Sequence, residues 1–130
     1  MTMMKKLPDA EFDIMKVVWQ LVPPVTSTML MKELNMHSEK VWKLQTVHTL
    51  LGRLINRGFL KSEKTGKERF FTPLIGQVEY LQFETQSFVK QYHGNSLLNL
   101  VNTLYHGEEL SDEDIAELAK WAKECRRING

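Results

Sequence analysis

The segment from residue 45 to residue 58 is the part of this chain best suited to chemistry with another molecule. At 100° per residue it divides into an apolar stripe for the core and a polar face without a single acid. The stripe consists of Val47, Leu50, Leu51 and Leu54. The polar face consists of Gln45, Thr46, His48, Thr49, Gly52, Arg53 and Asn56. A compact, acid-free face suits a DNA major groove, where a carboxylate would meet phosphates. A surface helix that merely lacks acids is the alternative.

Arg53 is the strongest candidate for a contact on this face. Its guanidinium can bind guanine O6 and N7 together, or a phosphate. The alternative is a surface ion pair with Glu63 or Glu68. Gly52 costs about 1 kcal/mol relative to alanine inside a helix. A close approach of either the DNA backbone or the preceding helix would explain it.

The neighbouring positions supply smaller polar contacts. Thr46 and Thr49 can donate to phosphate or pack against a thymine methyl group, although Thr46 also suits a helix start. Gln45 and His48 can read base edges. Trp42 is either a core anchor or a ring against the sugar-phosphate, and Lys43 beside it adds a cation.

Charge is distributed unevenly along the chain. Residues 1–73 contain 12 Lys/Arg and 7 Asp/Glu, a balance of 12 − 7 = +5, whereas residues 74–130 contain 5 and 9, a balance of 5 − 9 = −4. This pattern favours a polyanion-binding amino-terminal half and a carboxy-terminal half that does not touch the polyanion. Lys64, Lys67 and Arg69 are expected to meet phosphate or the minor groove, with a solvated hairpin as the alternative.

The order of the expected elements defines the fold of the first half. A helix starts near Pro8 and Asp9, a second is capped by Thr26 or Ser27, and a third ends at Gly58. Residues 59–64 and 68–72 read as two strands around a turn at 65–66. The sequence therefore predicts a mainly α protein with a small β-hairpin, in which residues 1–75 form a winged helix-turn-helix domain that binds DNA.

Residues 76–130 read as a helical dimerisation domain. Of its three expected helices, the middle one is apolar on nearly every side, so the helices cannot bury themselves well alone. We expect a homodimer, whereas packing onto the chain's own first domain is the alternative. The residues expected in the interface are Leu81, Phe88, Tyr92, Leu97, Leu100, Val101, Leu104, Ile115 and Leu118.

Composition argues against several other classes of protein. No apolar run approaches the length of a membrane span, and acids interrupt any signal-like start, so we expect a cytoplasmic protein without membrane insertion. We expect no cofactor and no metal, because His, Cys and Glu lack ligand spacing and Cys125 stands alone. Catalytic motifs are lacking, so an enzyme is not expected. A winged helix that binds only other proteins remains the alternative function.

Several stretches resemble a known family. They are residues 9–15 with Trp19, then Trp42, residues 46–54, 57–60, 69–73 and 110–115. With these stretches the chain resembles the penicillinase-repressor family, which includes methicillin-resistance and copper-responsive repressors of Gram-positive bacteria. The resemblance implies a dimeric repressor that binds a palindromic operator and blocks transcription of its own operon.

The resemblance also implies two routes of release. In the penicillinase branch a membrane sensor-protease triggers cleavage of the dimerisation domain, at an Asn-Phe bond after an Asn-Ser-Leu segment. Here residues 95–97 keep that segment but no Asn-Phe follows, so the Asn99-Leu100 bond is the nearest candidate. In the copper branch, cysteine pairs near the carboxy terminus bind the metal. Those pairs are missing here, which argues against copper sensing.

Overall fold

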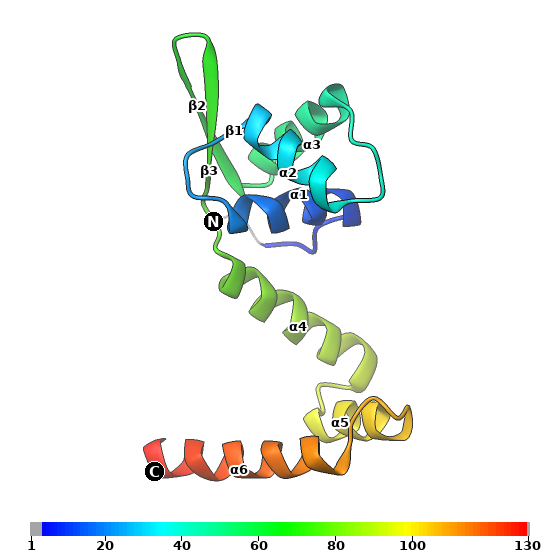
Figure 1. The fold of residues 1–130 in the computed structure, drawn as a ribbon. Coiled ribbons are helices and arrows are strands. Elements are labelled where there is room, and N and C mark those ends of the chain that lie inside the picture. The colour runs from blue at the N-terminus through cyan, green and yellow to red at the C-terminus, as the bar shows by residue number, and fades with distance from the viewer. Residues whose placement is uncertain (1–3, 130) are drawn as a thin grey trace. The chain divides into compact units, whose positions relative to one another are not determined.

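The computed structural model describes residues 4–129, with side chains through Arg127. The first three residues and Gly130, which the expected domain ranges include, lie outside the described part. Six helices and three strands follow one another along the chain (Figure 1). They are α1 (Asp9–Gln20), β1 (Val25–Thr26), α2 (Ser27–His37), α3 (Leu44–Asn56), β2 (Leu60–Thr65), β3 (Glu68–Pro73), α4 (Gln77–His93), α5 (Leu97–His106) and α6 (Asp112–Asn129).

The first three helices and the sheet form a winged helix. The helices α1, α2 and α3 pack against one another, and the β2–β3 hairpin projects from them (Figure 1). The sheet has the order β1-β3-β2 and is antiparallel throughout. The sequence predicted the hairpin but missed β1, in which Val25 pairs with Phe71 and Thr26 with Phe70.

Local signals in the sequence explain where the elements begin and end. Thr26 caps α2, because its hydroxyl accepts a hydrogen bond from the N–H of Met29 at 3.2 Å. Gly58 ends α3 with a φ of +81°, a conformation that favours glycine. Its N–H donates to the carbonyl of Ile55, and the next N–H, of Phe59, donates to that of Leu54. These two bonds form a Schellman motif, so the predicted helix end is confirmed.

The core of the first unit extends into α4. The chain divides into two compact units, residues 1–84 and residues 85–130. Tyr80 is fully buried, and its hydroxyl accepts a hydrogen bond from the N–H of Leu7 at 2.7 Å. Its ring lies against the rings of Phe12, Trp19 and Phe59. The compact amino-terminal unit therefore runs past the expected boundary after residue 75, because the start of α4 completes its core.

Candidate nucleic-acid interface

The helix α3 has the two faces that its sequence predicts. Val47, Leu50, Leu51 and Leu54 are buried against α1 and α2. The opposite side is exposed and carries Gln45, Thr46, His48, Thr49 and Arg53. This face of α3 is therefore accessible to an external partner.

Arg53 is available for an external partner. It makes no ion pair or hydrogen bond with another side chain within the described residues, so the expected alternative of a pair with Glu63 or Glu68 is not formed. Glu63 instead binds Lys61, with 3.0 Å between carboxylate and ammonium. The hydroxyl of Thr49 donates a hydrogen bond to the carbonyl of Gln45 at 3.0 Å, and its oxygen can still accept a hydrogen bond from a partner.

The beginning of α3 carries no side-chain cap. Lys43 occupies the N-cap position with extended backbone, and its side chain cannot accept a hydrogen bond. The first N–H groups of the helix therefore have no capping side-chain acceptor. Such donors, together with the helix dipole, favour an anion.

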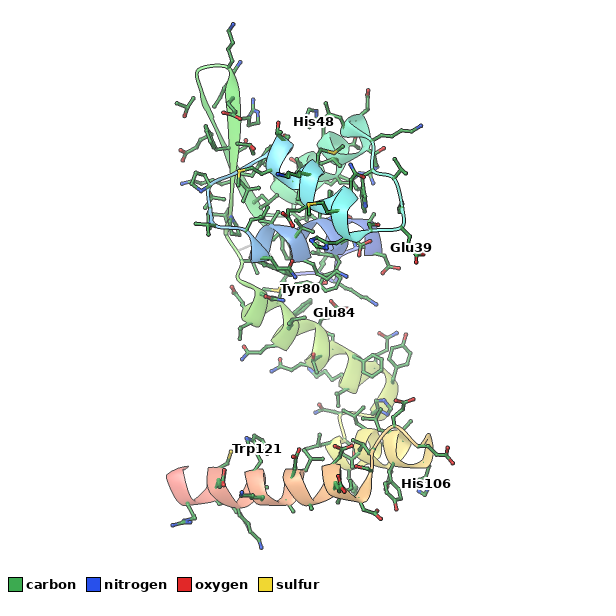
Figure 2. The ribbon with its side chains drawn as sticks, viewed as in Figure 1. Glu39, His48, Tyr80, Glu84, His106 and Trp121 are labelled. Carbon is green, nitrogen blue, oxygen red and sulfur yellow. The ribbon has the colours of Figure 1, made fainter. Side chains whose placement is uncertain are left out.

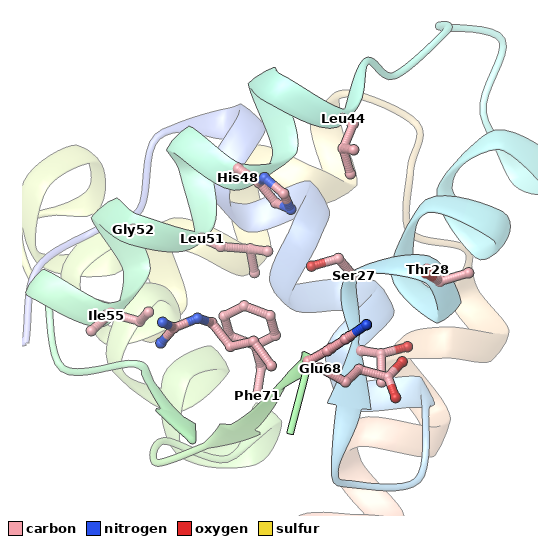
Figure 3. Close-up of a pocket in the computed structure, with 12 residues that line it drawn as sticks. Ser27, Thr28, Leu44, His48, Leu51, Gly52, Ile55, Glu68 and Phe71 are labelled. Carbon is pink, nitrogen blue, oxygen red and sulfur yellow. The ribbon is translucent and has the colours of Figure 1, made fainter. Parts of the chain in front are cut away.

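A cleft separates α3 from the wing and the start of α2 (Figure 3). It encloses about 540 Å³. His48 points from α3 toward Ser27 of α2, and Phe71 and Glu68 of β3 face them (Figure 3). The complete lining is Thr26, Ser27, Thr28, Leu44, His48, Leu51, Gly52, Ile55, Lys67, Glu68, Arg69 and Phe71. The floor is apolar, and the rim carries hydroxyls, an imidazole, two cations and the carboxylate of Glu68.

The wing presents cations next to this cleft. Lys64, Lys67 and Arg69 are all exposed. The guanidinium of Arg69 donates to the hydroxyl of Ser62 at 2.9 Å, across the hairpin. Lys64 and Arg69 are direct cross-strand partners. Like charges placed opposite each other destabilise a sheet, so this pair favours an anion close to the hairpin.

Trp42 belongs to the core, and this corrects its place among the expected DNA contacts. Only 4% of its surface is exposed, and it lies in the same apolar cluster as Val47 and Leu50. Its backbone N–H donates to the side-chain carbonyl of Asn35 at 2.9 Å. The ammonium of Lys40 lies 4.8 Å from its ring centre. Trp42 thus fixes the chain just before α3, in agreement with the first interpretation of the sequence, that of a core anchor.

A partly buried ion pair, which was not expected from the sequence, holds the end of α3. The Nε of Arg57 donates to the carboxylate of Glu11 at 3.0 Å, and only 1% of Glu11 is exposed. A signal was available, because Glu11 lies on the same helical stripe as Ile14, Met15 and Val18. An acid on an apolar stripe indicates a buried partner.

The described residues contain no cluster of His, Cys, Asp or Glu able to hold a metal ion. Likewise, none of the helices in residues 4–129 combines the length and hydropathy needed to cross a membrane.

Comparison with known proteins agrees with this geometry. Residues 7–124 match the penicillinase repressor family. The chain belongs to the penicillinase repressor family. It is 34% identical over 118 residues to the penicillinase repressor of Bacillus licheniformis, covering 88% of this chain and 90% of that one. It is 24% identical over 113 residues to the methicillin resistance regulatory protein MecI of Staphylococcus aureus strain N315, covering 87% and 89%.

A solved structure supports the fold of the first unit. The solution structure of the DNA-binding domain of the repressor BlaI is 34% identical to this chain, with a TM-score of 0.52. The match covers 62% of this chain and 94% of that domain. The winged helix is therefore the DNA-binding fold of this family, and the relatives are repressors rather than enzymes.

The second unit of this repressor-family chain exposes its apolar side chains. No residue from 85 to 127 is buried. Phe88 is 48% exposed and Trp121 is 61% exposed. Of the expected interface residues, Leu81, Phe88, Tyr92, Leu97, Leu104 and Leu118 are exposed, and Leu100, Val101 and Ile115 are half-buried. Trp121, which was not among the residues expected in the interface, lies on α6 (Figure 2) and lines an open hollow with Leu118 and Leu110.

The Asn99-Leu100 bond lies in the first turn of α5. The N–H of Leu100 donates to the carbonyl of Ser96 at 3.2 Å. The carbonyl of Asn99 accepts from the hydroxyl of Thr103 at 2.8 Å. The side-chain oxygen of Asn99 lies 2.7 Å from Nδ1 of His93. Both polar groups of the bond are thus engaged in the helix.

Proposed function

We propose that this chain is a dimeric, sequence-specific repressor that inserts α3 into the major groove of a palindromic operator. The observation that carries the proposal is the acid-free exposed face of α3, on which the side chain of Arg53 has no partner among the described residues. Base and phosphate contacts come from Lys43, Gln45, Thr46, His48, Thr49 and Arg53, and wing contacts come from Lys64, Lys67 and Arg69. Because DNA is the partner, the protein would act in the cytoplasm.

Electrostatics support the role of the wing. Lys64 and Arg69 face each other across the hairpin, and Lys67 lies at its turn. A DNA phosphate close to the hairpin would relieve the repulsion between the opposed cations. Contacts of this kind position a protein on DNA without reading its sequence.

Exposed apolar surface supports the dimer. The second unit buries no residue in the range 85–127, although it carries large side chains such as Phe88, Leu97 and Trp121. A soluble unit without a core needs a partner to cover such a surface. A second copy of the chain is the simplest one, because it brings the same apolar faces in a symmetric arrangement.

The names of the relatives support the proposal that the repressor controls an operon for antibiotic resistance. One relative is a penicillinase repressor and another is a methicillin resistance regulatory protein. Release would follow inactivation of the dimerisation helices, by cleavage at Asn99-Leu100 under the control of a membrane sensor-protease. Because both polar groups of that bond are hydrogen-bonded, α5 must open locally before a protease can cut it.

A gel-shift titration with the full chain tests the proposal. Replacing Arg53→Ala should weaken binding to the operator by about 1–3 kcal/mol, because a bidentate base contact is lost. Lys16→Ala is a matched control, since it removes an exposed cation from α1. If Arg53→Ala and the parent bind the operator equally, α3 does not read it. If the parent shows no salt-dependent DNA binding, the chain is a protein-interaction module instead.

A further inference from the structure

No contact within the described part of the protein explains why residue 52 is a glycine. It lies in the middle of α3, where glycine costs helix stability relative to alanine. A Cβ added there would meet no atom of another segment within 4 Å, so close packing against α2 does not require glycine. Its φ is not positive, so the backbone does not require glycine either.

The position of Gly52 indicates a role in binding a partner outside the protein. Gly52 lines the cleft between α3, α2 and β3, and it lies one turn after His48 (Figure 3). At this position the wall of the cleft is bare helix backbone. A partner entering the cleft can therefore approach α3 more closely here than beside any other residue of the helix.

The chemistry of the cleft selects the partner. Ser27 and Thr28 supply hydroxyls from the start of α2, and Lys67 and Arg69 supply cations from the wing. Glu68 is the one acid of the lining, so two cations outweigh it. Hydroxyls and cations around an apolar floor match a strand of sugar-phosphate, whose deoxyribose carbons are apolar and whose phosphates are anionic.

We propose that Gly52 keeps the cleft open for the sugar-phosphate backbone of one operator strand, which packs directly against α3 at this residue. The inference rests on the proposed DNA-binding function, and it names the part of the DNA, the sugar-phosphate backbone of one strand, that lies against Gly52 of the acid-free face. Gly52 thus trades helix stability for a closer fit to DNA, a compromise found where function and stability compete.

Gly52→Ala in the full chain separates the two effects. We expect the midpoint of thermal unfolding to rise by about 5 °C, because alanine favours the helix and has free space. We expect binding to the operator to weaken by about tenfold, because a methyl group intrudes on a packed contact. Binding to an unrelated duplex should weaken by the same factor, since the backbone carries no sequence information. Gly52→Leu should weaken both further.

Gly76→Ala is the matched control. It makes the same chemical change at a glycine with open space and without positive φ, and it does not line the cleft. It should leave DNA binding unchanged.

Three other outcomes of the Gly52→Ala experiment would each overturn the proposal. If Gly52→Ala unfolds at a higher temperature but binds both duplexes like the parent, the cleft does not receive DNA. If only operator binding weakens, a base edge rather than the strand backbone occupies it. If Gly52→Ala destabilises the fold, glycine serves the protein instead. In each case Arg53→Ala still reports independently on the proposed function.

Discussion

Truncation is the most direct test of the packing described above. It shows where the chain can be cut without unfolding the winged helix. We compare a chain that ends at residue 75 with one that ends at residue 87. The first ends at the boundary expected from the sequence and lacks Tyr80, which is fully buried in the amino-terminal core. The second keeps Tyr80 and the first turns of α4, and it loses only residues outside the compact amino-terminal unit.

The expected difference follows from the loss of one buried aromatic ring. Emptying such a site costs about 3–5 kcal/mol. Small domains are stable by only about 5–15 kcal/mol, so this loss is a large share of the total. Since 1 kcal/mol shifts the midpoint of a domain this size by about 4–8 °C, we expect the chain ending at residue 75 to melt at least about 12 °C lower.

Thermal unfolding followed by far-UV circular dichroism measures this difference. Full-length Tyr80→Phe is the matched variant, because it keeps the ring and removes only the hydroxyl, which accepts from the buried N–H of Leu7 and hydrogen-bonds the side chain of Glu84. It should lose about 1–3 kcal/mol. If the chains ending at residues 75 and 87 melt at the same temperature, α4 does not complete the core, and the burial argument is refuted.

Three further predictions concern single residues. Lys67→Ala should weaken binding to specific and unrelated duplexes alike and lower the slope of log affinity against log salt by about one unit, which Lys16→Ala should not do. Arg57→Ala leaves the buried carboxylate of Glu11 unpaired and should cost about 3 kcal/mol in urea unfolding; equal midpoints would contradict this. Burial raises the pKa of Tyr80 to about 12 from 10.0. Because the folded state favours the neutral phenol, this stabilisation is complete below pH 10 and should be lost between pH 10 and 12; Tyr80→Phe should abolish that loss.

Local patterns made most of the winged helix predictable. The Schellman motif at Gly58, the cap at Thr26 and the split faces of α3 each depend on residues a few positions apart. The strand β1 was missed because two residues are too short for a periodic pattern. It exists because Val25 and Thr26 meet the free edge of β3.

Long-range contacts were not predictable in the same way. Tyr80 contacts Leu7, at the other end of the amino-terminal unit, and no spacing along the helix reveals such a partner. The pattern of α4 instead drew attention to Leu81 and Phe88, and the expected boundary after residue 75 leaves Tyr80 outside the first domain. The place of Trp42 was equally hard to predict, because an aromatic side chain next to a recognition helix suits both the core and a contact with DNA.

The place of Tyr80 also constrains how release from DNA can work. Every residue of the buried core lies at or before position 80, whereas the candidate Asn99-Leu100 bond lies beyond it. Cleavage there would leave the winged helix folded, with Arg53 and the wing unchanged. If the chain is the dimer proposed above, affinity would fall because each winged helix would then bind its half-site alone, and losing that linkage costs on the order of 100-fold. Mass spectrometry of the protein from β-lactam-treated cells should therefore show an amino-terminal fragment ending at Asn99. An intact chain while the target genes are switched on would exclude proteolysis and require an effector that acts on the assembled dimer.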